Sequence, residues 1–354
     1  MLGEELMRKV KNRNILISTG KTGGHIIPAL SVGRNYIIEF DEVKVIYASI
    51  EDSHIFKDFL KKGENLNFIF LKDWQGFNVK VLYENVFEIF KALKKFNVKK
   101  VLIFGSYLSL PVIIASLLNG SKIYIHEQNV LPGRANKLAS IFSKKIFISY
   151  AKTAKYFPSF LRRKIVLTGN PVRNYNFKDL EEKNQILFLG GSQGAMTINK
   201  FIVDNIEKIE ALPSINFVVI TGKRNYGDVL GELKGNVPKN LRLLPFEYEI
   251  LDLMFESKLI VSRAGAVTLS EIAYIKKPSV LVPFPFARDN HQYINAKYFE
   301  EKGAAILINN DELENNFDLI IKLFNSPEKL KEMKEALNNL FIPEAESRIV
   351  KNLC

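Results

Sequence analysis

Short apolar runs alternate with longer mixed stretches along most of the chain. The first half contains the runs NILIS, VKVIYA, KVLIFG, KIYIH and KKIFIS, and the second half contains QILFLG, NFVVIT, KLIVS and SVLVPF. Apolar runs of this length between turn residues predict buried strands, and the stretches between them predict helices. The alternation is typical of parallel sheets flanked by helices, so the sequence predicts an α/β protein.

The two halves of the chain begin in the same way. Each opens with a strand, a glycine turn and a helix, as NILISTGKTGGHIIPALSVG and as QILFLGGSQGAMTINKFIVDNI. The repetition predicts two doubly wound domains that bind ligands at their strand ends. A turn-rich, charged stretch at 168–185 marks the boundary. We therefore expect a first domain at 1–170 and a second at 171–342, with a helix at 343–354 that packs back on the first.

Length and composition exclude several classes of protein. A chain of 354 residues exceeds the usual size of a single core. The only cysteine is Cys354, which excludes internal disulfides and cysteine-based metal sites and fits a reducing cytoplasm. The charged N-terminus does not resemble a signal peptide, and the longest apolar stretch, 108–118, is short and contains Pro111. We expect a soluble or peripheral protein.

The net charge of +12 favours an anionic partner such as nucleic acid, an anionic membrane or a phosphorylated substrate, unless it reflects a lysine-rich proteome. Lysines crowd residues 72–100, where Tyr83, Phe87 and Phe90 follow one another at helical spacing. Beside them stand Lys91, Lys94, Lys95, Lys99 and Lys100. An apolar stripe of this kind usually faces a sheet, and the alternative is a face that contacts a membrane.

The segment STGKTGGH, residues 18–25, contains the Gly-Lys-Thr triplet of nucleotide triphosphatases. A Walker loop needs a glycine five residues before Gly20, and that residue is Ile15, inside an apolar run. The segment does not match the dinucleotide-binding fingerprint either, although Glu51 follows the second strand as a ribose-binding acid would. What remains is a strand, a glycine turn and the helix IIPALSVGRNYI, whose N-terminus attracts an anion.

Four polar segments stand at predicted strand ends. They are the opening loop with His25, HEQNVLPGRANK at 126–137, GGSQG at 190–194, and SRAGAVTLSE at 262–271 with PFARDNHQYINA at 285–296. Each has a structural alternative: Gly23 and Gly24 for tight packing, His126 as a hydrogen-bonded core histidine, and Ser270-Glu271 as support for a helix start. Together they predict a ligand site, because such folds bind ligands at strand ends.

These segments also resemble a known family. TGGHIIPAL, HEQN, GNPVR, GGSQGA, GAVTLSEIA and DNHQYINA are similar, in this order, to segments of the MurG family (glycosyltransferase family 28), from Asn14 to about residue 305. That family moves N-acetylglucosamine from UDP-GlcNAc to lipid I, undecaprenyl-pyrophosphoryl-MurNAc-pentapeptide, and so makes lipid II for peptidoglycan. The resemblance implies a GT-B fold, two Rossmann-like domains facing across a cleft, with no metal and no cofactor.

The resemblance assigns a donor site. UDP-GlcNAc is expected to contact Thr22, Gly23, Gly24, Asn129, Arg173, Ser192, Gln193, Glu247, Ala266, Val267, Thr268, Leu269, Ser270, Glu271 and Gln292. In this set Ser192 resembles the diphosphate-binding turn, Arg173 the residue at the uridine end, and Glu271 the acid that holds the ribose hydroxyls. A carboxylate suits a vicinal diol, which offers two donors.

Other members of the donor set have roles of a different kind. Residues 266–270 resemble a helix N-terminus that stabilises departing UDP with backbone N–H groups. Asn129 and Gln292 look like sugar-binding residues. Glu247 falls where the family reads uracil through the main chain, which leaves its side chain without an assigned role.

On the acceptor side the chain departs from the family pattern. Lys21 replaces a glycine of the opening loop and adds charge toward the acceptor diphosphate. Tyr107 lies in GSYLSLP, a motif that is usually richer in glycine, and His291 stands where many members have glutamine. We expect Lys21 and Tyr107 to bind the acceptor, and the role of His291 is open.

Two residues compete for the role of general base in a single inverting displacement. His25 precedes a helix whose positive end disfavours the imidazolium, so a neutral imidazole is able to accept a proton. Glu127 is the competing base, and in a third interpretation His25 only holds its loop by a hydrogen bond.

Two other function classes remain as alternatives. The first is another GT-B enzyme that uses a UDP-sugar: a lipid glucosyltransferase, or a UDP-GlcNAc epimerase with a carboxylate pair. The second is a basic module that binds nucleic acid, which would interleave aromatics with arginines on an exposed sheet. Because this chain keeps its polar residues at loop tips, we expect no nucleic acid. We expect a peripheral enzyme on the cytoplasmic face of the cell membrane, bound to its anionic surface.

Overall fold

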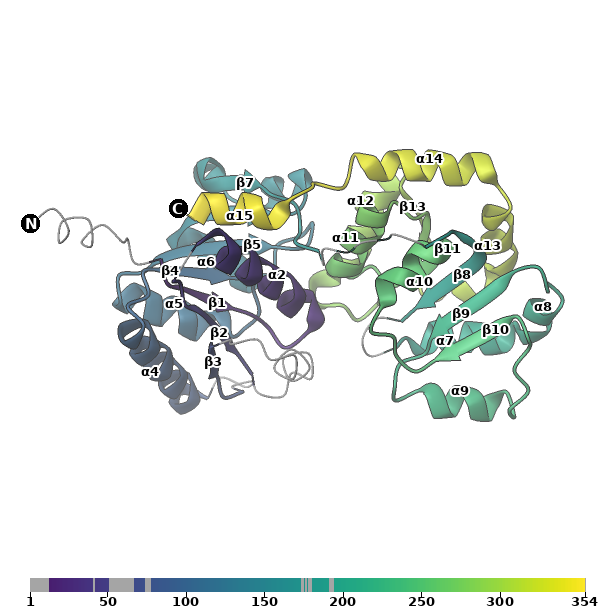
Figure 1. The fold of residues 1–354 in the computed structure, drawn as a ribbon, viewed down its shortest axis with the longest axis horizontal. Helices are drawn as coiled ribbons and strands as arrows, with labels where there is room; N and C mark the ends of the chain where they lie inside the picture. The colour runs from purple at the N-terminus through teal and green to yellow at the C-terminus, as the bar shows by residue number, and fades with distance from the viewer. Residues whose placement is uncertain are drawn as a thin grey trace, which may run out of the picture. The chain divides into compact units, whose positions relative to one another are not determined.

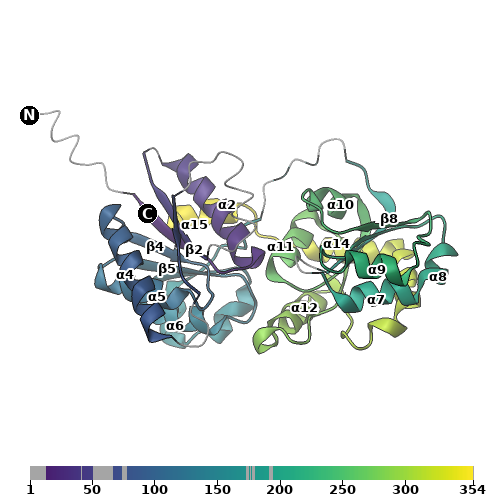
Figure 2. The same ribbon diagram turned by 90° about the horizontal axis from the view of Figure 1, so that it is seen from below.

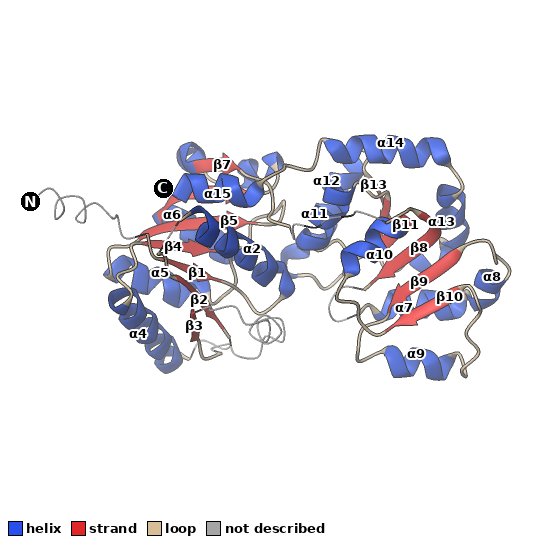
Figure 3. Ribbon diagram, viewed as in Figure 1, coloured by secondary structure: helices blue, strands red, loops and turns tan. Residues whose placement is uncertain are grey.

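The computed structural model describes residues 13–40, 42–50, 67–73, 78–172, 175, 177, 180–190 and 194–353. The chain divides into two compact units, Met1–Val172 with Ile342–Cys354, and Arg173–Phe341. In each unit a parallel sheet has helices on both faces (Figures 1 and 3). The sequence-based expectation of an α/β protein with two parallel sheets is confirmed.

The sheet of the first unit has the strand order β3-β2-β1-β4-β5-β6-β7. Its strands are β1 (Ile15–Ser18), β2 (Val45–Ser49), β3 (Asn67–Phe70), β4 (Lys100–Ile103), β5 (Lys122–Glu127), β6 (Ser143–Ile148) and β7 (Ile165–Leu167). The strand order reverses at β1, which pairs in parallel with β2 on one side and with β4 on the other. Ligands of such sheets bind at this reversal, beyond the carboxyl ends of the strands.

Two helical layers enclose this sheet. Figure 2 shows α4 (Val79–Lys95), α5 (Ser109–Leu118) and α6 (Arg134–Phe142) on one face, and α2 (Gly23–Glu39) with α15 (Ala345–Leu353) on the other. Successive strand residues point to opposite faces, so Leu16 packs toward the first layer and Ile15 and Ile17 toward the second. Two 3₁₀ helices, η1 (Ala151–Tyr156) and η2 (Ser159–Lys164), connect β6 to β7.

The second unit repeats the plan with the strand order β10-β9-β8-β11-β12-β13. Its strands are β8 (Lys183–Leu189), β9 (Asn216–Ile220), β10 (Leu241–Leu244), β11 (Ser257–Ser262), β12 (Ser279–Leu281) and β13 (Ala305–Leu307). The order reverses at β8, which pairs with β9 and β11. The loops after β8 and β11 therefore lie beside this unit's reversal point.

The helices of the second unit also form two layers. One layer shares a core with β8, β9 and β11 and comprises α7 (Met196–Asp204), α8 (Ile206–Glu210), α9 (Tyr226–Glu232), η4 (Leu313–Asn315), α13 (Phe317–Phe324) and part of α14 (Pro327–Asn338). Figure 3 shows α10 (Ile250–Glu256), α11 (Ala266–Ile275) and α12 (His291–Glu301) over the other face. The short η3 (Arg288–Asn290) leads into α12.

The strands that the hydrophobic pattern did not predict are β3, β7, β10 and β13. All four are edge strands, and each is three or four residues long with partly exposed side chains. An edge strand has a neighbour on one side only, so less of it needs to be apolar. The pattern therefore revealed the strands inside the sheets and missed their edges.

Two helices differ from expectation. Helix α2 begins at Gly23, three residues before the predicted start, and has Pro28 in its second turn. His25 therefore lies inside the first turn and does not precede the helix. In α4, Ile89 and Leu93 face the sheet, while the side chains of Tyr83 and Phe87 are 69% and 49% exposed.

The expectation that the aromatic stripe of α4 faces the sheet is thus wrong for Tyr83 and Phe87. Phe90 alone of the three packs against the core. Within the described part of the chain, no helix is both long enough and apolar enough to cross a membrane.

Candidate active site

In the first unit, the loop between β1 and α2 holds His25 at the carboxyl edge of the sheet. Thr22 is the N-cap of α2, and its Oγ1 lies 3.2 Å from Nδ1 of His25. A Cβ atom on Gly20 would lie 2.8 Å from that nitrogen and 3.0 Å from Cβ of Ser106. Glycine at position 20 therefore allows the loops after β1 and β4 to close on the imidazole.

A carboxylate that the sequence did not reveal joins the two residues expected to bind the acceptor. Oδ2 of Asp73 lies 2.5 Å from Nζ of Lys21, and Oδ1 accepts a hydrogen bond of 2.7 Å from the Tyr107 hydroxyl. Asp73 follows β3, an edge strand that the hydrophobic pattern missed, so its position at a strand end was hidden. The three side chains hold the loops after β1, β3 and β4 together.

Glu127, the last residue of β5, is 1% exposed and accepts four hydrogen bonds. Oε1 accepts from the backbone N–H of Asn129 at 2.9 Å and from its Nδ2 at 3.2 Å. Oε2 accepts from the N–H of Gly133 at 3.0 Å and from Nδ2 of Asn136 at 2.8 Å. Burial raises the pKa of Glu127, and these four hydrogen bonds oppose the rise. Both oxygens are occupied in holding the loop between β5 and α6.

The structure confirms the alternative interpretation of His126, which is a hydrogen-bonded core histidine. The ring is fully buried, and burial lowers its pKa to about 4, so it is neutral at pH 7. Nε2 lies 3.0 Å from the carbonyl oxygen of Gly169 and must carry the proton, because a carbonyl only accepts. Nδ1 then accepts from Nε2 of Gln128 at 3.3 Å.

In the second unit, α11 starts directly at the carboxyl edge of the sheet. Gly265 is its N-cap and accepts a hydrogen bond of 3.0 Å from the N–H of Leu269, so the N–H groups of residues 266–268 point out of the N-terminal end of the helix. Ser270 donates a hydrogen bond of 2.8 Å to the Ala266 carbonyl, and Glu271 is 5% exposed. The arrangement presents a helix N-terminus to an anion, with a carboxylate in the next turn.

Helix α12 places Gln292 at its second position. Oε1 of Gln292 accepts a hydrogen bond of 3.0 Å from the N–H of Phe284, so the amide group is oriented with its NH₂ available as a donor. Asp289 and Asn290 precede the helix with φ of 52° and 54°, the left-handed region. His291 lies in the same turn, with Nδ1 2.7 Å from the carbonyl oxygen of Arg288.

The loop after β10 carries Glu247, whose Oε1 accepts a hydrogen bond of 3.1 Å from the N–H of Glu249. Its neighbours Phe246 and Tyr248 contact each other edge to face at 4.8 Å, and Nζ of Lys223 lies 4.8 Å from the Phe246 ring centroid. An aromatic pair thus flanks the main chain that is expected to read the base.

The remaining donor residues, Arg173, Ser192 and Gln193, lie outside the described residues, as does Glu51. The two glycines that flank residues 191–193 have no room for a side chain. A Cβ atom on Gly190 would collide with the backbone nitrogen of Ala195, and one on Gly194, where φ is +78°, would collide with the carbonyl oxygen of Thr221. Only glycine fits at these two positions.

Comparison with known proteins places the chain in a family. Residues 15–148 match the glycosyltransferase family 28 N-terminal domain, and residues 185–349 match the glycosyltransferase family 28 C-terminal domain. The chain belongs to glycosyltransferase family 28. The described strand-end residues of both units lie inside these two matches.

Individual family 28 relatives match almost end to end. A protein of Bacillus subtilis (strain 168) is 32% identical over 95% of this chain and 97% of its own length. A protein of Desulforamulus reducens is 32% identical over 95% of this chain and 96% of its own length. Both are named UDP-N-acetylglucosamine--N-acetylmuramyl-(pentapeptide) pyrophosphoryl-undecaprenol N-acetylglucosamine transferase.

Solved structures agree with the assignment to family 28. The crystal structure of Acinetobacter baumannii MurG is similar with a TM-score of 0.76 and 25% identity, over 96% of this chain and 99% of that chain. A UDP-GlcNAc 2-epimerase from Neisseria meningitidis has a TM-score of 0.69 at 15% identity, which shows a shared fold alone. The chain has the GT-B fold.

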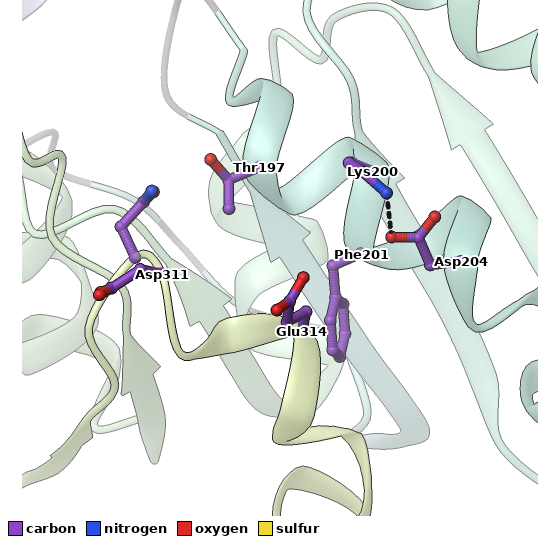
Figure 4. Close-up of a pocket in the computed structure, with 7 residues that line it drawn as sticks. Thr197, Lys200, Phe201, Asp204, Asp311 and Glu314 are labelled. Carbon is purple, nitrogen blue, oxygen red and sulfur yellow. Dashed lines mark hydrogen bonds and ion pairs between the residues drawn. The ribbon is translucent and has the colours of Figure 1, made fainter.

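Figure 4 shows a pocket of about 320 Å³ in the second unit. Its lining comprises Thr197, Lys200, Phe201, Asp204, Asn310, Asp311 and Glu314, and Lys200 pairs with Asp204 at 2.5 Å. Because the lining has three carboxylates and one ammonium group, the pocket is negatively charged and disfavours a nucleoside diphosphate. Within the described ranges, no three His, Cys, Asp or Glu side chains are arranged to hold a metal ion.

Proposed function

We propose that this family 28 enzyme is an inverting transferase that moves N-acetylglucosamine from UDP-GlcNAc to the 4-hydroxyl of the N-acetylmuramoyl sugar of lipid I. The observation that carries the proposal is the similarity of 95% of the chain to transferases named for this reaction. The first unit binds the acceptor and the second unit binds the donor. The product is lipid II, the precursor of peptidoglycan.

The reaction is a single displacement. The acceptor oxygen forms a bond to C1 of N-acetylglucosamine while the bond from C1 to the UDP oxygen breaks, and UDP leaves with the electron pair. The N-terminus of α11 supports this step, since the backbone N–H groups at a helix N-terminus stabilise the negative charge that develops on the leaving diphosphate. Glu271 in the next turn holds the ribose hydroxyls, and Gln292 donates from its amide to the sugar.

His25 is the general base that takes the proton of the acceptor hydroxyl. Its position at the third residue of α2 places the imidazole beside the positive end of the helix, which favours the neutral form that accepts a proton. Glu127 is a weaker candidate because both of its oxygens already accept hydrogen bonds. We assign Glu127 the role of holding the loop that carries Asn129.

The acceptor diphosphate binds near Lys21 and Tyr107. Asp73 holds both side chains, so the ammonium group and the hydroxyl are oriented before the substrate arrives. Pre-orientation lowers the entropy that binding would otherwise cost.

An anionic membrane surface is the partner of the first unit, on the cytoplasmic side. Helices α4, α5 and α6 cover one face of the sheet, as seen in Figure 2, and large apolar side chains on all three are exposed. They are Val79, Tyr83 and Phe87 on α4, Leu117 and Leu118 on α5, and Leu138, Ile141 and Phe142 on α6. Exposed lysines, Lys91, Lys94 and Lys95 among them, follow on α4, and Nζ of Lys91 lies 5.3 Å from the Phe87 ring centroid. Apolar side chains with a basic rim are typical of peripheral binding to anionic lipid.

A transfer assay tests the proposal directly. The purified enzyme is incubated with radiolabelled UDP-GlcNAc and a lipid I analogue, and we expect label in the lipid product and release of UDP. Conversion of UDP-GlcNAc to its 2-epimer without acceptor would instead indicate an epimerase and overturn the proposal.

The donor site has its own test. Glu271→Ala leaves ribose hydroxyls unpaired at a cost of about 1 to 3 kcal/mol, so we expect the donor KM to rise by about 5- to 150-fold. Glu256→Gln is the control, because Glu256 pairs with Lys183 at the start of β8. An unchanged donor KM in the Glu271 variant would show that the donor site is misplaced.

A further inference from the structure

Arg263, which directly follows β11, is a buried cation that the proposed reaction does not yet use. Its side chain is 8% exposed. Nη1 donates to the carbonyl oxygens of Val282 and Pro283, both at 3.1 Å, and to Oδ1 of Asn310 at 2.7 Å. The guanidinium carbon lies 5.6 Å from the ring centroid of Phe284.

These bonds join the carboxyl ends of three neighbouring strands. Arg263 belongs to the loop after β11, Val282 and Pro283 to the loop after β12, and Asn310 to the loop after β13. A single side chain therefore sets the spacing of three loops at the edge where the donor binds.

Two further hydrogen bonds connect the loops that Arg263 joins to residues expected to bind UDP-GlcNAc. The N–H of Phe284, next to Pro283, donates to Gln292 at 3.0 Å. Nδ2 of the buried Asn295 donates to the carbonyl oxygen of Ala264 at 3.2 Å, two residues before α11 begins. The start of α11 and the side chain of Gln292 are thus held by the same group of loops.

The charge of Arg263 lacks the partner that a buried cation usually has. Among the residues that the structure describes, its hydrogen-bond acceptors are two carbonyls and one amide, all uncharged. Burial lowers its pKa to about 10, so the guanidinium stays protonated at pH 7. By contrast, the buried Lys277 of the same unit has Glu182 at 2.6 Å. Burial of a cation without a counter-charge is costly, and a bound anion would offset that cost.

We propose that Arg263 is a positioning residue of the donor site, and that its buried charge strengthens the binding of the donor's diphosphate at the N-terminus of α11. The proposal rests on the proposed function, which makes a uridine diphosphate sugar the donor. The buried charge should affect the two parts of the donor differently, because it attracts the anionic diphosphate and has no such attraction for the uncharged nucleoside.

Calorimetric binding of UDP and of uridine tests this distinction. We compare the wild type with Arg263→Met, which removes the charge, and Arg263→Lys, which keeps the charge and loses the fork of donors. Unit charges about 10 Å apart at an effective dielectric constant near 20 change an affinity by about tenfold. We therefore expect Arg263→Met to bind UDP about tenfold more weakly relative to uridine, and Arg263→Lys to retain most of the preference for UDP.

Lys277→Met is the matched control, since it removes a buried cation that already has a carboxylate partner. We expect it to lower Tm without changing the ratio of UDP to uridine affinity. Tm is measured for every variant as the check on folding.

The outcomes separate the two proposals. If the wild type shows no preference for UDP over uridine, the donor assignment itself fails. If the wild type prefers UDP and Arg263→Met keeps that preference, only the role of Arg263 is overturned. Should Arg263→Met fail to fold, an Arg263→Lys variant that is folded and has lost the preference would equally overturn it.

Discussion

Glu127→Gln tests whether the buried carboxylate of the first unit anchors its loop or takes the acceptor proton. Glutamine keeps one acceptor oxygen and replaces the other with an NH₂ group. Whichever way the amide turns, that group meets two N–H donors, either both from Asn129 or those of Gly133 and Asn136. The substitution therefore removes two hydrogen bonds and sets donors against donors.

The expected loss of unfolding free energy follows from these hydrogen bonds. Hydrogen bonds to a charged group contribute about 1.5 to 3 kcal/mol each, so two of them contribute about 3 to 6 kcal/mol. Burial raises the pKa of Glu127, so removing its charge recovers part of that free energy and moves the expected loss to about 3 kcal/mol. For a unit of this size, Tm should fall by about 6 to 12 °C.

Scanning calorimetry and urea unfolding measure the change. Glu84→Gln is the control, because Glu84 is partly exposed and accepts from Lys72 at 2.9 Å, and the loss of such a surface ion pair should leave Tm near that of the wild type. A Tm within about 2 °C of wild type for Glu127→Gln would refute the anchoring role. A loss of kcat larger than that of His25→Ala would make Glu127 the base.

Three other changes test the remaining groups. His25→Ala should lower kcat by about 10² to 10⁴ while the donor KM stays near wild type, and more than about a tenth of wild-type kcat would exclude His25 as the base. Reversing Lys94 and Lys95 to Glu should weaken binding to anionic vesicles in a salt-dependent way and spare transfer to a soluble acceptor; unchanged vesicle binding would argue against the membrane face. The folded pKa of His126 is depressed to about 4, so the contribution of the neutral ring to the unfolding free energy is complete above about pH 6.5. That contribution is lost as pH falls toward 4, by roughly 3 kcal/mol. A His126→Gln variant should therefore show a flatter dependence of unfolding free energy on pH in that window.

The sequence by itself determined the fold class and the strand ends that carry the polar loops. Inner strands are buried on both faces, so continuous apolar runs such as ILIS and QILFL mark them without knowledge of their neighbours. Because glycine turns and polar segments follow these runs, the sequence predicted ligand-binding loops at the carboxyl edge of each sheet. The family motifs then named the residues within it.

The tertiary structure decided which side chains meet. Asp73 reaches Lys21 and Tyr107 across strands that are distant in sequence, and no local pattern encodes such a contact. The outward face of α4 was likewise set by packing, since Ile89 and Leu93 occupy the sheet-facing positions and leave Tyr83 exposed. Periodicity reports that a helix has an apolar stripe, but the layer against which it packs decides which part of that stripe is buried.

The same division holds for the buried polar groups. In the sequence Glu127 and Arg263 are ordinary charged residues beside strands, and either one is compatible with exposure at a loop tip. Only the fold gives Glu127 four donors and gives Arg263 three uncharged acceptors from two other loops. Local periodicity determines which segments are buried, whereas the partners of a buried charge come from distant segments and exist only after the sheet has assembled.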